Sequence, residues 1–136
     1  MALDLYLQKD SSFPKTLENH FLAFEDDGYF WFLYSPFFEE ISAATGQSID
    51  LYDGGFFDGE YLELFQRLIE NIRTNLKEKP EFWEECTGTI VYQGEGKVEK
   101  MFSTVIKSRL EEILSTLETA VGEAKRQNIG ILFYGD

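Results

Sequence analysis

The chain has 136 residues, 43% of them hydrophobic and 16% aromatic, and a formal net charge of −13 at pH 7. This size and composition are typical of a globular protein and exclude a disordered one, so we expect a single domain over residues 1–136. The negative charge excludes nucleic acid and anionic membrane surfaces as expected partners and favours basic ones.

The N-terminal segment predicts a strand. Leu3, Leu5 and Leu7 alternate with other side chains, which is the pattern of a half-buried strand over 2–8. The same segment lacks the basic region that opens a signal peptide, and no stretch approaches the ~18 apolar residues of a membrane span. These features predict a cytoplasmic protein that does not bind membranes.

Residues 20–45 allow two interpretations. The turn dipeptide Asp27-Gly28 would join strands over 20–25 and 29–34 into a hairpin. Alternatively, apolar residues at helical spacing predict a helix over about 29–45 with a break near Pro36. We favour the helix, with Ser35 able to cap its second part and Gly46 able to end it.

The rest of the chain predicts long helices between strands. A glycine-rich loop over 53–59 precedes a helix over 59–77, for which Asp58 stands at the capping position. A strand is expected over 87–92 and a central apolar strand over 129–134. Residues 97–127 keep one apolar face and predict either one helix, continuous or bent near Ser108, or two helices.

This order of elements predicts an α+β domain. Strands at both ends would form a small sheet, with the two long amphipathic helices packed on one of its faces.

The charge is concentrated in the first half of the chain. Between Lys15 and Arg67 lie 51 residues without a lysine or arginine, and this acidic window holds 11 carboxylates and 14 of the 22 aromatic residues. One interpretation is a solvated acidic face over an aromatic core. The other is a binding surface for a cationic protein, because aromatic side chains supply contact area while carboxylates steer a basic partner.

Catalytic and metal-binding patterns are weak. A single histidine, His20, and a single cysteine, Cys86, exclude an ordinary zinc cluster, and we expect Cys86 to be buried as a small apolar residue. Counted from Asp50, an EF-hand loop would lack two oxygen ligands. Adjacent carboxylates are expected by chance among 25 acids. We therefore predict no metal, no cofactor and no catalytic residues.

The stretches 46–52 (GQSIDLY) and 131–136 (ILFYGD), together with the size and acidity, give the chain its resemblance to a known group. It resembles the small acidic immunity proteins of bacterial contact-dependent and polymorphic toxin systems. The resemblance implies a cognate toxin domain as partner and tight, pair-specific binding.

Three functions follow as hypotheses. The first is an inhibitor that neutralises a basic, nuclease-type toxin through an acidic, aromatic surface. The second is a homo-oligomeric adaptor, and the third is an enzyme whose carboxylate site the sequence hides. For the first, the expected contact residues are Asp26, Asp27, Trp31, Asp50, Tyr52, Asp53, Phe56, Phe57, Asp58 and Glu60.

Overall fold

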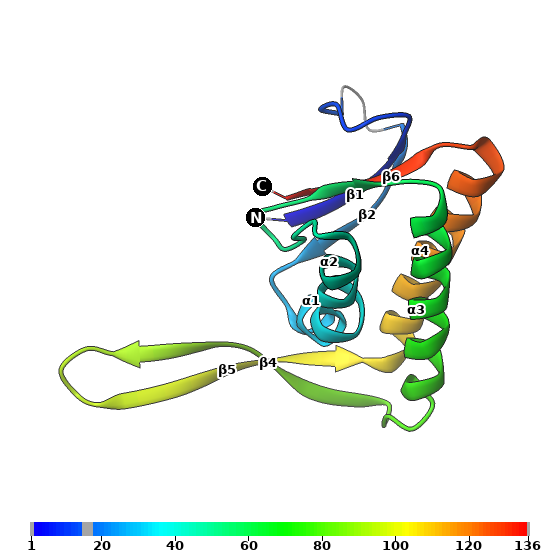
Figure 1. Cartoon of the computed structure of the whole chain (residues 1–136). Coiled ribbons are helices and arrows are strands. Elements are labelled where there is room, and N and C mark those ends of the chain that lie inside the picture. The colour runs from blue at the N-terminus through cyan, green and yellow to red at the C-terminus, as the bar shows by residue number, and fades with distance from the viewer. Residues whose placement is uncertain (1, 15–17, 136) are drawn as a thin grey trace.

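A four-stranded antiparallel sheet forms one side of the molecule in the computed structural model, which describes residues 2–14 and 18–135 (Figure 1). Its strand order is β2-β1-β6-β3. The first and last strands of the chain are therefore the two central ones, as expected for the C-terminal strand. The strands are β1 (Ala2–Gln8), β2 (His20–Glu25), β3 (Gly55–Phe57) and β6 (Gly130–Gly135).

An irregular helix follows β2, which confirms the helical interpretation of this region. It consists of α1 (Gly28–Leu33), a wider π-helical segment η1 (Tyr34–Glu39) and α2 (Glu40–Thr45). The Asp27 carboxylate caps α1 by accepting the N–H groups of residues 29 and 30, and Gly46 ends α2 with φ of 77°. Pro36 lies in the wider segment, since it has no N–H to continue a regular ladder.

Two longer helices, α3 (Glu60–Leu76) and α4 (Lys107–Gln127), pack against each other. All the helices lie on one side of the four-stranded sheet in Figure 1. α4 contacts β2, β1 and β6, whereas α3 reaches the sheet through Phe65. The residue at the N-cap of α3 is Gly59, so the expected cap by the Asp58 side chain is wrong. No helix in the described ranges is long and apolar enough to cross a membrane.

The remaining strands form a long hairpin that projects from the body (Figure 1). We call residues 82–106, which comprise β4 (Phe82–Tyr92) and β5 (Lys97–Ile106), the arm. The predicted helix over 97–127 is therefore wrong for its first ten residues. Val98, Phe102 and Ile106 are spaced by four, and a spacing of four places side chains on one face of a strand as well as on one face of a helix.

The base of the arm packs on α1. Val105 is fully buried, and the ring of Trp83 contacts that of Phe32 with centroids 5.2 Å apart. This close approach depends on Gly28, because a Cβ there would lie 2.8 Å from Val105 Cγ2 and 2.9 Å from the Ser103 carbonyl oxygen. The sequence pointed to Gly28 as a turn residue, but its structural role is to admit β5 beside the helix.

Phe133 of β6 lies at the centre of the hydrophobic core. Its ring centroid is 5.8 Å from that of Phe38, 6.2 Å from Phe57 and 6.1 Å from Phe65. These contacts join the central strand to η1, β3 and α3. Most of the aromatic residues of the acidic window thus build the core rather than the surface; those fully buried are Phe30, Phe37, Phe38, Phe57 and Phe65.

The role of Gly28 is testable by a paired alanine substitution. Gly28→Ala should lower the free energy of unfolding by about 1–3 kcal/mol, because the new methyl group overpacks the contact with β5. Gly122→Ala is the control, since Gly122 lies inside α4 with open space around its Cα, and it should raise that free energy by up to about 1 kcal/mol. Equal effects in urea denaturation would contradict the assigned contact.

The central place of Phe133 predicts a second difference. Phe133→Ala should cost about 3–5 kcal/mol of unfolding free energy, because it leaves a cavity between three other rings. Tyr52→Ala should change it by less than about 0.5 kcal/mol, because Tyr52 is 64% exposed. A small effect of Phe133→Ala in the same denaturation assay would show that the core is centred elsewhere.

Candidate functional site

The ten expected contact residues lie in three places. The first is the turn between β2 and α1, which carries Asp26, Asp27 and Trp31. Asp27 is occupied as the cap of α1, and the Asp26 carboxylate accepts a hydrogen bond from Trp31 Nε1 at 2.7 Å. The acids of this turn therefore serve local structure, although Asp26 remains exposed.

The second place is the loop that leads into β3. The Asp50 carboxylate accepts the backbone N–H groups of Tyr52 and Asp53, each at 2.8 Å, and so fixes the turn. This turn holds Tyr52 outward and leaves Asp53 exposed. The side chain of Asp53 forms no hydrogen bond or ion pair with any residue that the structure describes.

The third place is the far end of β3, where Asp58 and Glu60 are exposed at the start of α3. Alternation along β3 turns Phe56 outward and Phe57 inward. Phe57 is fully buried, so its expected role as a surface anchor is wrong. Phe56 is half-buried on the outer side of the sheet, opposite Leu132.

Strand order separates these groups. β2 and β3 are the two edges of the sheet, with β1 and β6 between them. Three inter-strand spacings of about 4.8 Å place these edges about 14 Å apart. The ten residues therefore lie in separate clusters, and the loop before β3 is distinct from the β2–α1 turn.

The loop before β3 borders a hollow, which we call the edge site. Its volume is about 330 Å³, and its lining includes Tyr52, Asp53 and Phe56 together with Tyr134 of β6. Tyr134 is 36% exposed, and its ring contacts that of Phe13 with centroids 5.2 Å apart. The described residues of the site thus combine the carboxylate of Asp53 with the exposed rings of Tyr52 and Tyr134.

Sequence reasoning missed Tyr134 and Phe13. Alternation in the C-terminal strand was a usable signal for Tyr134, because Phe133 points inward and its neighbours therefore point outward. Phe13 had no such signal, since only the fold brings the loop after β1 next to β6.

The backbone of the edge site is held by Gln47. Its amide accepts the N–H of Phe56 and donates to the carbonyl of Phe56, both at 3.1 Å. These two bonds take the place of a neighbouring strand at the outer side of β3. Gly54 lets the loop press against β6, because a Cβ there would lie 1.8 Å from the Phe133 carbonyl oxygen.

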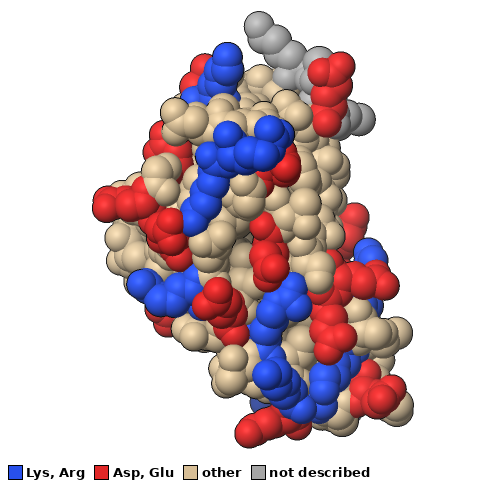
Figure 2. Space-filling model, turned by 90° about the vertical axis from the view of Figure 1, so that its right-hand side faces the viewer, with Lys and Arg blue, Asp and Glu red and all other residues tan. Residues whose placement is uncertain are grey.

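The basic residues lie mainly on another side of the molecule. Figure 2 looks onto α3 and α4, where lysine and arginine side chains lie among aspartate and glutamate. Many of these charges pair within the chain: Arg73 with Glu118, Lys125 with Glu63, Arg109 with Glu112 and Arg126 with Glu123. Hydrogen bonds from Arg126 and Gln127 hold the pKa of Glu123 below its ordinary value.

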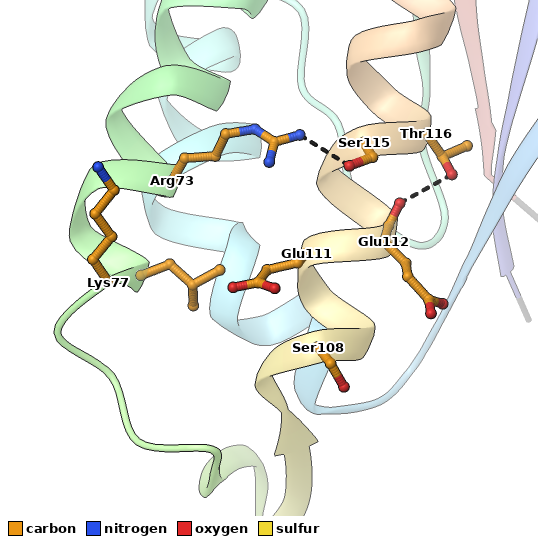
Figure 3. Close-up of a pocket in the computed structure, with 8 residues that line it drawn as sticks. Arg73, Lys77, Ser108, Glu111, Glu112, Ser115 and Thr116 are labelled. Atoms are coloured by element: carbon orange, nitrogen blue, oxygen red, sulfur yellow. Dashed lines mark hydrogen bonds between the residues drawn. The ribbon is translucent and has the colours of Figure 1, made fainter.

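A larger groove of about 720 Å³ lies between α3 and α4 (Figure 3). Its lining includes Arg73 and Lys77 of α3 and Glu111, Glu112 and Ser115 of α4, and in Figure 3 the Glu111 side chain points toward α3. Arg73 Nη2 donates to Ser115 Oγ at 3.1 Å, and Arg73 Nε donates to Glu118 at 3.2 Å. Charges of both signs line this groove, so it favours neither an acidic nor a basic partner.

The arm exposes a different chemistry. Most of the large exposed hydrophobic residues of the described chain lie on it: Phe82, Ile90, Val91, Tyr92, Val98, Met101, Phe102 and Ile106. Cys86 is also exposed there, so the expectation that it is buried is wrong. Cys86 lies on the part of the arm that the body does not cover. The residues next to it in the sequence do not indicate this position.

Near the tip of the arm, the Tyr92 hydroxyl donates to Glu99 at 2.7 Å across the two strands. This hydrogen bond raises the pKa of Tyr92 above its ordinary value. Across residues 2–14 and 18–135, no group of three or more His, Cys, Asp or Glu side chains is arranged to hold a metal ion.

No family model matches this chain, and neither a characterised protein nor a solved structure shows significant similarity to it.

The role of Gln47 gives a prediction for the edge site. Gln47→Ala should lower the free energy of unfolding by about 1–3 kcal/mol, the sum expected for two hydrogen bonds, and should speed amide hydrogen exchange at Phe56. Gln127→Ala is the control, because that exposed amide bonds only to Glu123 on its own helix. Unchanged exchange at Phe56 would show that Gln47 does not hold the strand.

Proposed function

We propose that this chain is a protein-binding inhibitor, an immunity protein that neutralises a basic, nuclease-type toxin. In this proposal it acts in the cytoplasm by occupying its partner, without catalysis and without a cofactor. The edge site is the surface that would receive the partner.

The arrangement around Asp53 is the observation that carries the proposal. The exposed carboxylate of Asp53, which has no side-chain partner among the residues that the structure describes, lies beside the exposed rings of Tyr52 and Tyr134. The residues described as lining the hollow include no lysine or arginine. A lysine or arginine of a partner can pair with the carboxylate and also lie over an aromatic face, which adds about 0.5–2 kcal/mol for each such contact.

The chemistry of a nuclease explains why such a surface would inhibit one. A protein that cleaves nucleic acid presents lysine and arginine to the phosphate backbone. An acidic surface with exposed rings can bind the same lysine and arginine side chains that a nucleic acid binds. The charge of the whole chain, −13, would accelerate association with that partner.

Co-expression with the product of the neighbouring gene tests this function. If that product carries a basic, toxic C-terminal domain, the two proteins should co-purify, and this chain should restore growth to cells that express the toxic domain. Absence of both co-purification and protection, with both proteins folded and expressed, would contradict the proposal.

The edge site makes a sharper prediction with that partner. Asp53→Lys should slow association roughly tenfold, the low end of what electrostatic steering contributes, and added salt should weaken the wild-type complex in the same way. Glu70→Lys is the matched control, because it makes the same charge change at an exposed position on α3. Equal effects of the two variants in stopped-flow measurements would move the binding surface away from the edge site.

A further inference from the structure

The outer face of the arm is apolar and uncovered. Within the described part of the chain, β4 and β5 pair only with each other, and the body covers only the inner face at the base, through Trp83 and Val105. The opposite face carries five of the large exposed hydrophobic residues, between 49% and 68% exposed: Phe82, Val91, Val98, Phe102 and Ile106.

The register shows that these side chains form a regular series of rows. From base to tip, the cross-strand pairs on the outer face are Phe82/Ile106, Glu84/Thr104, Cys86/Phe102, Thr89/Lys100 and Val91/Val98. A bulge after Cys86 shifts the register by one residue, so that Thr89 and Val91 of β4 lie on the same face as Lys100 and Val98 of β5. Apolar rows thus alternate with polar ones, and the two polar rows carry opposite charges.

The series of rows on one arm is complementary to the same series on a second arm that runs in the opposite direction. The row with Glu84 and the row with Lys100 lie on either side of the central row, Cys86/Phe102. A second arm laid face to face in the opposite direction would place its Glu84 row over the Lys100 row of the first, and the reverse. The apolar row at each base would meet the apolar row at the other tip.

We propose that the outer face of the arm binds a second copy of this chain, with a two-fold axis through the Cys86/Phe102 row. Such an interface is isologous, because the same patch serves both subunits. In this arrangement β4 faces β4 and β5 faces β5, so Glu84 of one copy lies diagonally across from Lys100 of the other, and two such charge pairs fix the register. The inference does not rest on the proposed inhibitory function, since it concerns a different surface.

The available area agrees with a reversible dimer. Five side chains that each expose on the order of 100 Å² give about 500 Å² of apolar surface per copy. Two copies would bury about 1,000 Å², which is the lower limit for a specific interface, so the dimer should dissociate on dilution. A patch of this size is near the upper end of what monomeric proteins leave uncovered.

The charge of the arm favours this occupant over a basic protein. Residues 82–106 carry the acids Glu84, Glu85, Glu95 and Glu99 and the bases Lys97 and Lys100, a net charge of −2 out of the total of −13. The mixed signs match a copy of the same surface better than a uniformly cationic one.

Cross-linking through Cys86 provides the test, because it is the only cysteine of the chain and it is exposed in the central row. Facing sheets lie about 10 Å apart, which is too far for a disulfide but within reach of a short bismaleimide. The wild-type chain should give a covalent dimer with this reagent, and light scattering should show a dimer that appears with rising concentration.

Charge exchange tests the register. Lys100→Glu or Glu84→Lys alone should weaken dimerisation at least tenfold, because each places like charges in two facing rows. The double variant Glu84→Lys/Lys100→Glu should restore both the dimer and the cross-link. Asp53→Lys, at the edge site, should leave dimerisation unchanged, which separates this inference from the proposed inhibitor function.

Three results would overturn the inference. The first is a chain that stays monomeric up to millimolar concentration. The second is a dimer that persists in both single charge variants, which would place the interface on another surface. The third is a double variant that is folded by circular dichroism yet remains monomeric, which would show that Glu84 and Lys100 do not pair between the subunits.

Discussion

The packing of Phe133 against rings from three other elements is the constraint on which the rest of the structure depends. Phe38, Phe57 and Phe65 reach it from η1, β3 and α3, so one central strand position links most of the fold. Because inward positions of β6 and β3 are filled by this cluster, their neighbours Tyr134 and Phe56 point to the other side of the sheet. The edge site is thus a consequence of how the core is filled.

This packing also explains how the acidic window is used. Most of its aromatic side chains lie in the core, while the carboxylates remain at the surface, where several form caps and turns such as those at Asp27 and Asp50. The first sequence-based interpretation of the window, a solvated acidic face over an aromatic core, therefore describes most of it, and the second, a binding surface for a cationic protein, stays a prediction. In the part of the window that the structure describes, Tyr52 and Asp53 bring an exposed ring together with a carboxylate that has no partner among the described residues.

Local periodicity was sufficient to predict the terminal strands, the helix now assigned to 60–76 and the irregular helix around Pro36. It failed for residues 97–106, where a spacing of four is compatible with a helix and with a strand. Strand order is set by contacts between distant segments, so the separation of Asp26 from Asp53 at opposite edges was not predictable. The exposure of Cys86 was missed for the same reason, because only the fold shows that the arm leaves the body. The mixed α+β class itself was predictable from the order of elements.

Two surfaces of different chemistry therefore remain uncovered, an acidic aromatic edge site and an apolar arm with balanced polar rows. Amide hydrogen exchange of the full chain at low and high protein concentration tests most directly whether they are separate. A rise in protein concentration should protect the amides of residues 82–106 and leave those of residues 47–56 unchanged. Exchange in the arm that is independent of concentration, or protection that appears at the edge site instead, would contradict it.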